Sequence, residues 1–165
     1  MIDLKPLGRT PAMLEVHAKL QVTVPEDTDN PYLQGLFRPI DTEWTADTQS
    51  MQVIGEIPRD LNGMYVRNSH NQMHAPMGVY HPFDGDGMLH SVSFTDDGVV
   101  YRNRYVRTPK YLAETKANKI VMRSFGHNAP GGIRKNIGRL PANCANTSLI
   151  YHGGKLLALW EGGRP

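Results

Sequence analysis

Residues 80–90 read Tyr80-His81-Pro82-Phe83-Asp84-Gly85-Asp86-Gly87-Met88-Leu89-His90, and this stretch says more about the fold than any other. Its acids and glycines invite comparison with a calcium loop. A loop that starts at Asp84, however, has Leu89 where an EF-hand needs glycine and Thr95 where it needs a bidentate glutamate. Asp side chains bond nearby amides in turns, and glycines take left-handed conformations there. We therefore interpret the stretch as a turn that leads into a strand.

Short β-like runs separated by turn residues surround this stretch. Strands are expected over residues 53–57, 63–67, 88–95, 99–106, 148–151 and 155–160. Asp96-Asp97-Gly98 and His152-Gly153-Gly154 are expected to close hairpins. A short helix is predicted over residues 110–118, and a polar, glycine-rich loop over residues 126–138. The pattern indicates an all-β chain, which suits a sandwich, a barrel or part of a propeller.

The first fifty residues differ in composition from the rest. They are rich in Pro, Asp and Thr and show weak hydrophobic periodicity, so we expect residues 1–50 to form an extended arm and residues 51–165 to form the β region. Within the arm, Thr10-Pro11 is expected to cap a short helix that runs to Lys19.

Charge, cysteine content and hydrophobicity argue against a nucleic-acid-binding protein, a disulfide-bonded protein and a transmembrane protein. The 18 basic and 16 acidic residues give a formal net charge of +2, so no nucleic-acid partner is predicted. Cys144 is the only cysteine, which rules out an internal disulfide and favours a cytoplasmic location. The longest apolar run covers only residues 156–160, so no transmembrane segment is expected.

Two sets of residues could carry chemistry. Four histidines, His70, His74, His81 and His90, fall close together, but they lack the helical H-E-x-x-H spacing or a tight i, i+2 pair of a metal site. Glu161 follows the apolar strand at residues 156–160 and precedes two glycines. On the residues alone, His70, His74 and His81 are surface or turn residues, and Glu161 is a solvated carboxylate. His90 shares a strand face with Met88, Val92 and Phe94 and is expected to be partly buried.

Four ordered blocks together resemble the carotenoid cleavage oxygenase family. This family includes carotenoid, apocarotenoid and lignostilbene dioxygenases and proteins like the retinal pigment epithelial membrane protein. The blocks are residues 55–68, 81–90, 101–108 and 156–163, and Phe83-Asp84-Gly85-Asp86-Gly87-Met88-Leu89-His90 is the most specific. The resemblance covers residues 30–165 and concerns only the N-terminal portion of the proteins in this family. One departure is Ser69-His70-Asn71-Gln72, where relatives usually have Gly-Pro-Asn-Pro.

The resemblance implies the first blades of a seven-bladed β-propeller. It implies a non-heme Fe(II) dioxygenase that uses O₂ to cleave a conjugated C=C bond of an apolar carotenoid, apocarotenoid or stilbene into two carbonyl products. Four histidines bind the iron in this family, and they are expected downstream of Pro165, so no metal ligand is assigned within this chain. Glu161 matches the first family glutamate that orients an iron-binding histidine. Relatives also take lipophilic substrate from bilayers, which implies peripheral membrane contact, although no strongly amphipathic basic helix is evident here.

Two alternatives stay open at this point. The 165-residue chain could be a catalytically inactive truncated fragment, because Glu161 has no ligand histidine to orient. It could also be a small β binding module that uses the histidine-rich loop at residues 70–90 to bind Zn.

Overall fold

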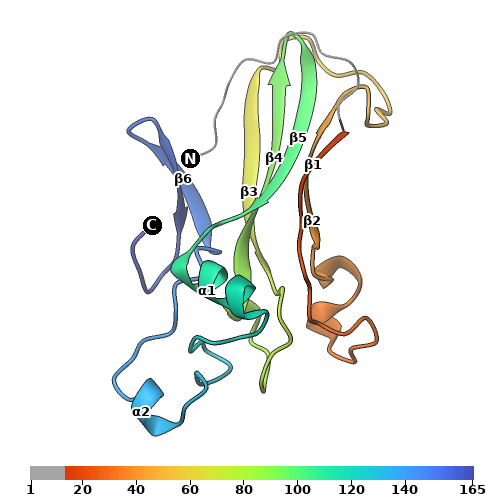
Figure 1. Ribbon diagram of the computed structural model, residues 1–165. Coiled ribbons are helices and arrows are strands. Elements are labelled where there is room, and N and C mark those ends of the chain that lie inside the picture. The colour runs from red at the N-terminus through yellow and green to blue at the C-terminus, as the bar shows by residue number, and fades with distance from the viewer. Residues whose placement is uncertain (1–13) are drawn as a thin grey trace.

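The computed structural model describes residues 14–165, which form two antiparallel sheets with short helices around them (Figure 1). The larger sheet has five strands in the order β1-β2-β5-β4-β3, and the smaller one pairs β6 with β7. The strands are β1 Leu14–Lys19, β2 Thr42–Asp47, β3 Gly63–Asn71, β4 Asp86–Thr95, β5 Gly98–Tyr105, β6 Ser148–His152 and β7 Lys155–Leu159. The helices are α1 Pro109–Ala117 and α2 Ile133–Asn136, with 3-10 turns η1 Pro31–Leu33, η2 Gly35–Phe37 and η3 Pro82–Asp84.

The meander β3-β4-β5 forms one side of the large sheet. Thr95 pairs with Gly98 across a two-residue loop, and Gly98 has a φ of +123°, a conformation that glycine adopts without strain. The second hairpin joins β6 to β7 through Gly153 and Gly154, whose φ angles of +56° and +75° suit a tight two-residue turn. Both predicted hairpins are confirmed, as is the all-β class.

The large sheet extends across the predicted boundary at residue 50. Strand β2 pairs with β5 through Thr45 and Arg102, and β1 pairs with β2, so part of the expected arm belongs to the sheet. The Asn103 side chain reinforces this junction, because it donates to Thr42 O at 2.9 Å and accepts from Trp44 N at 2.8 Å. The expected helix from Thr10 to Lys19 is wrong where it can be compared: residues 14–19 are β1, and residues 10–13 lie outside the described residues.

Residues 53–57 form no strand, contrary to expectation. Gly55 takes a φ of +92°, which interrupts an extended backbone, and Ile54 is 90% exposed. The β-branched residues of this segment do not by themselves produce a strand, because strand propensity depends on cross-strand neighbours and on burial.

The core lies where the lower end of the large sheet meets α1 (Figure 1). Met73, Met88, Tyr105 and Tyr111 form it, with the rings of Tyr105 and Tyr111 stacked at 5.3 Å between centroids. The predicted helix is confirmed as α1, whose first turn is capped by Thr108 Oγ1 accepting from Tyr111 N at 3.0 Å. This packing fixes α1 against the start of β4.

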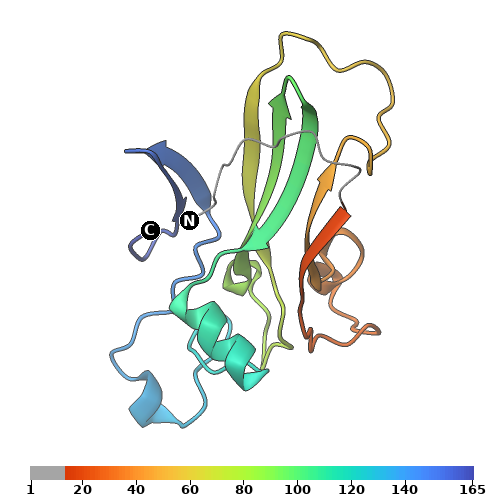
Figure 2. The same cartoon turned by 45° about the horizontal axis from the view of Figure 1, so that its top comes forward.

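The upper part of the large sheet exposes apolar side chains on one face. The pairing registers place Leu14, Ala46, Tyr101, Val92 and Tyr65 in one row across all five strands. Within this row, Leu14 is 57% exposed and Tyr65 is 62% exposed. Val92 and Tyr101 are half-buried and Ala46 is buried, so the apolar exposure in this row lies on the edge strands β1 and β3 of the large sheet. Figure 2 shows the smaller sheet standing apart from this one, beside β3.

Candidate functional site

The block at residues 83–90 is built around a buried carboxylate, that of Asp84, which is 1% exposed. Its two oxygens accept hydrogen bonds from Phe125 N at 2.7 Å and from Gly126 N at 2.8 Å. The imidazole of His127 approaches the same carboxylate, with Nδ1 3.9 Å from Oδ2. The expectation that this aspartate bonds nearby amides in a local turn is therefore wrong. It fixes a segment forty residues further along the chain.

The glycines of the block allow close backbone contacts. A Cβ on Gly87 would lie 2.2 Å from the carbonyl oxygen of Ala145, and one on Gly85 would lie 2.9 Å from Asn71 N. Neither glycine has a positive φ, so the expectation of left-handed turn residues is also wrong. Gly87 N donates to Cys144 O at 2.7 Å, which ties β4 directly to residues 144–145. The absence of a side chain is what allows this contact.

The second aspartate of the block, Asp86, belongs to a buried charge cluster with α1. Lys110 Nζ lies 3.0 Å from Asp86 Oδ1 and 2.9 Å from Glu114 Oε2, and none of the three side chains is more than 2% exposed. Burial raises the pKa of Asp86. Burial also opposes the charge on Lys110, but its attraction to Asp86 and Glu114 outweighs this and raises its pKa. Glu114 Oε1 also accepts from Val121 N and Met122 N, both at 3.1 Å.

This cluster was not singled out from the sequence. The available signal was Lys110 and Glu114 at i, i+4 on a predicted helix, a spacing that brings opposite charges together. Nothing in the sequence pattern placed Asp86 beside them. The cluster connects β4, α1 and residues 121–122, so its chemistry is structural.

The structure does not gather the histidines that the sequence places close together. His74 is buried, His70 and His90 are half-buried, and His81 is exposed. Two of them have separate partners: His90 Nδ1 lies 2.8 Å from Tyr101 Oη, and His81 Nδ1 accepts from Phe83 N at 3.2 Å. Within residues 14–165, no group of three or more His, Cys, Asp or Glu is arranged to hold a metal ion. The Zn-binding alternative has no support in this arrangement.

Glu161 lies in a tight turn directly after β7. It is exposed, and within the described part of the chain its carboxylate makes no hydrogen bond or ion pair. The turn closes through Gly163 N, which donates to Trp160 O at 3.3 Å. A Cβ on Gly162 would lie 2.6 Å from the ring of Trp160, so the indole packs against a glycine. The backbone of Glu161 is thereby fixed while its side chain stays unpaired.

An aromatic row connects this turn to the block at residues 83–90. The ring centroids of Trp160 and Phe125 lie 6.1 Å apart, those of Phe125 and His81 lie 5.6 Å apart, and those of His81 and Phe83 lie 5.1 Å apart. Phe83 and Phe125 are each 56% exposed. The row has no local sequence signal, because its members come from three separate segments. It places exposed aromatic surface beside the turn that carries Glu161.

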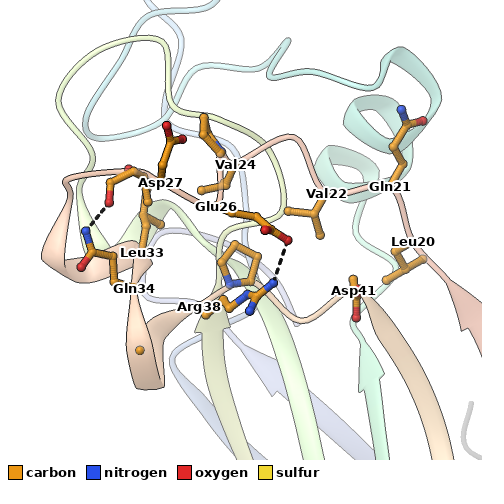
Figure 3. A pocket seen from close by; sticks show the side chains of 14 residues that line it. Leu20, Gln21, Val22, Val24, Glu26, Asp27, Leu33, Gln34, Arg38 and Asp41 are labelled. Atoms are coloured by element: carbon orange, nitrogen blue, oxygen red, sulfur yellow. Dashed lines mark hydrogen bonds and ion pairs between the residues drawn. The ribbon is translucent and has the colours of Figure 1, made fainter.

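A separate open hollow of about 1110 Å³ lies between residues 20–28 and residues 33–41. Figure 3 shows the Arg38–Glu26 ion pair, 3.1 Å long, and the Gln34 amide, which donates to Thr28 O. Both members of this ion pair are well exposed. None of the residues that the sequence singled out as site candidates lines the hollow.

Comparison with known proteins identifies the family. The pattern of the family described as "Retinal pigment epithelial membrane protein" matches residues 37–165. The chain belongs to the carotenoid cleavage oxygenase family. It is 42% identical over 126 residues to the apocarotenoid-15,15'-oxygenase of Synechocystis sp., covering 74% of this chain and 25% of that protein. It is 34% identical over 180 residues to a carotenoid 9,10(9',10')-cleavage dioxygenase 1 of Phaseolus vulgaris, covering 99% of this chain and 33% of that protein.

Solved structures agree with this membership in the carotenoid cleavage oxygenase family. The crystal structure of cobalt-substituted Synechocystis ACO superimposes with a TM-score of 0.65 at 41% identity, covering 77% of this chain and 27% of that one. The prediction of an all-β chain forming part of a seven-bladed β-propeller is confirmed. The chain spans about a quarter to a third of the length of these curated relatives. No helix in residues 14–165 is long and apolar enough to cross a membrane.

Proposed function

We propose that this chain supplies the first blades of a non-heme Fe(II) dioxygenase. The enzyme would cleave a conjugated C=C bond of a carotenoid, apocarotenoid or stilbene with O₂ and give two carbonyl products. The observation that carries the proposal is the match to the Synechocystis and Phaseolus enzymes, which are named as an apocarotenoid oxygenase and a carotenoid cleavage dioxygenase. An isoeugenol monooxygenase of Pseudomonas nitroreducens, 36% identical over 138 residues, is a further oxygenase among the relatives.

The described residues do not by themselves fit the iron that the family implies. They offer no group of three or more His, Cys, Asp or Glu arranged to hold a metal ion. We therefore propose that four histidine ligands come from sequence that follows Pro165. The exposed apolar side chains of Leu14 and Tyr65, on one face of the large sheet, support further blades, because a propeller blade packs its faces on its neighbours.

Glu161 is the residue of this chain that we assign to the iron site. Solved variants of the Synechocystis apocarotenoid oxygenase change a tryptophan to alanine and the glutamate directly after it to glutamine. Trp160-Glu161 is the single Trp-Glu pair in this sequence. A carboxylate that accepts the distal N–H of a metal-bound histidine fixes the ring and raises its basicity. An unpaired Glu161 on a fixed turn is suited to that role.

The aromatic row is proposed to face the substrate. Phe125 contacts Trp160, the residue before Glu161, and Phe83 continues the row through His81; both phenylalanine rings are half-exposed, and flat apolar surface of this kind suits a polyene or a stilbene. A cytoplasmic location is part of the same proposal, because the sole cysteine, Cys144, is buried and free.

The test has a genetic and a biochemical part. We expect the reading frame beyond codon 165 to encode a spaced series of histidines, and a frame without them would contradict the proposal. The longer gene product, loaded with Fe(II) under air, is expected to bleach an apocarotenoid or stilbene and to release two carbonyl products detectable by mass spectrometry. The 165-residue chain is the matched control, and we expect it neither to retain iron nor to cleave. Cleavage by this chain alone would overturn the assignment of the ligands.

A further inference from the structure

The turn that carries Glu161 is held to the rest of the fold through one side-chain amide, that of Asn143. Its Nδ2 donates to Arg164 O at 2.6 Å, which fixes the far side of the turn. Asn143 also packs against the turn, because a Cβ on Gly163 would lie 2.8 Å from the same nitrogen. Within the described part of the chain, no other side chain bonds the backbone of residues 161–164. The far side of this turn therefore depends on Asn143 for its position.

Two adjacent glycines explain why this turn needs an external contact. Gly162 and Gly163 follow Glu161 directly, and glycine has more backbone freedom than any other residue. The bond within the turn, from Gly163 N to Trp160 O, is 3.3 Å long, which is longer than most N–H···O bonds. The Asn143 bond, at 2.6 Å, is the shorter of the two contacts. Without it, we expect the Glu161 carboxylate to sample many directions.

The oxygen of the Asn143 amide fixes the other end of this link. Oδ1 accepts from Ala145 N at 2.8 Å, so one orientation of the amide serves both bonds. Ala145 has a φ of +49°, a left-handed conformation that costs energy in a residue with a Cβ and persists only where surrounding contacts hold it. Its carbonyl oxygen accepts from Asn68 Nδ2 at 2.7 Å, and Gly87 leaves room for it. The link thus runs from the block at residues 83–90 through Ala145 and Asn143 to the turn.

We propose that Asn143 is a positioning residue whose amide fixes the direction of the Glu161 carboxylate. This inference rests on the proposed function, in which Glu161 orients an iron-binding histidine. A carboxylate orients a ring only when its own direction is fixed, because the outer partners of metal ligands act through hydrogen-bond geometry. The strain at Ala145 supports this role, since strained residues cluster at active sites and clamps. Asn143 acts through Glu161 and needs no contact with substrate.

Nuclear magnetic resonance of the 165-residue chain tests this contact without iron. Asn143→Asp is nearly isosteric and keeps the acceptor for Ala145 N, but its carboxylate has no hydrogen to donate to Arg164 O. We expect backbone order parameters at residues 161–164 to fall from about 0.85 to below about 0.6 in this variant. Asn143→Ala adds no charge and is expected to loosen the turn in the same way. Asn62→Asp, at an exposed asparagine, is the charge control and should leave these order parameters unchanged.

A double-mutant cycle in the longer gene product tests the link to Glu161. Asn143→Ala is expected to weaken iron binding about fivefold, a loss typical of one hydrogen bond, and to lower the cleavage rate in parallel. In the Glu161→Ala background, the same change should cause no further loss, because no side chain remains to be oriented. A purely structural asparagine would cause equal losses in both backgrounds.

The two measurements separate the possible failures. Order parameters that stay high in Asn143→Asp, or losses that add in the double variant, would overturn the role of Asn143. If Glu161→Ala kept full iron affinity, the proposed role of Glu161 would fall and the positioning role with it, while a loosened turn would still report the contact with Arg164. Circular dichroism checks that each variant is folded. Should Asn143→Ala fail to fold, the isosteric Asn143→Asp takes its place in the cycle.

Discussion

Lys110 and Asp86 form an ion pair that is buried on both sides, with Nζ 3.0 Å from Oδ1 and side-chain exposures of 1% and 2%. The lysine comes from the first turn of α1 and the aspartate from the first residue of β4. Their contact therefore fixes α1 against the block at residues 83–90. Glu114 completes the cluster and links it to residues 121–122.

Removing the lysine is expected to destabilise the fold strongly. Lys110→Met leaves the carboxylates of Asp86 and Glu114 buried without a cation, a change that typically costs about 3–5 kcal/mol of unfolding free energy. Arg38→Met is the matched control, because the Arg38–Glu26 pair is exposed and such pairs contribute about 1 kcal/mol or less. Urea unfolding of both variants measures the difference. Similar losses of unfolding free energy in the two variants would show that the buried cluster stabilises the fold no more than an exposed ion pair does.

Gly87 is expected to tolerate no side chain. In Gly87→Ala the new Cβ would lie 2.2 Å from the Ala145 carbonyl oxygen, and this neighbour is backbone that cannot rotate away. Overpacking of this kind costs typically about 1–3 kcal/mol and occasionally more. At Gly78 the nearest atom to a new Cβ is 3.8 Å away, so Gly78→Ala should leave the midpoint of thermal unfolding nearly unchanged. A stable Gly87→Ala variant would contradict the close contact between β4 and residues 144–145.

The stability of the fold is expected to fall with pH below about 6.5, and His74 contributes to this. Burial lowers the pKa of His74, Glu114 raises it, and Lys110 lowers it further. As the pH falls through about 6.5, the ordinary pKa of histidine, His74 binds a proton in the unfolded chain before it does so in the folded chain. The contribution of His74 to the free energy of unfolding is therefore complete above about pH 6.5, and it is lost as the pH falls from there to the lower pKa of the folded state. The same direction holds for His70, His90 and His127, whose pKa values burial also lowers.

The change His74→Gln isolates this contribution. We expect the variant to show a shallower fall in unfolding free energy between about pH 7 and about pH 5 than the parent chain. His152 is exposed, so His152→Gln is the matched control for the loss of an imidazole. Denaturant titrations at several pH values measure both slopes. A parent chain that becomes more stable on acidification through this range would show that the buried histidines do not control it.

Local patterns predicted the elements that depend on neighbouring residues. The hairpin turns at residues 96–98 and 152–154 follow from glycine conformation, which acts over a few residues, and the helix expected at residues 110–118 is found at residues 109–117. The strand expected at residues 53–57 failed because a strand needs a partner, which local propensity cannot supply. The pairing of β1 with β2 and of β2 with β5 was missed, because it joins segments that are far apart in the sequence. Asn103 and Thr42, which reinforce it, are about sixty residues apart.

The candidate site was predicted only in part. Resemblance to the family drew attention to residues 83–90 and to Glu161, but it could not show what the aspartates bind. Asp84 bonds the backbone at residues 125–126, and Asp86 binds Lys110. The aromatic row from Phe83 to Trp160 could not be predicted either, because its members come from three segments that meet only in the folded chain.

Glu161→Gln is expected to separate function from stability. Because the carboxylate is exposed and makes no hydrogen bond within residues 14–165, its loss should change the unfolding free energy of the chain by no more than about 0.5 kcal/mol. In the longer gene product, loss of a carboxylate that orients a metal-bound histidine typically lowers metal affinity or activity about 10–100-fold. Glu56→Gln, another exposed glutamate, is the matched control and should affect neither quantity. Iron content and cleavage rate of the purified variants decide the matter. If Glu161→Gln kept the iron affinity and rate of the Glu56→Gln control, Glu161 would be a solvated surface residue, and its assignment to the iron site would be wrong.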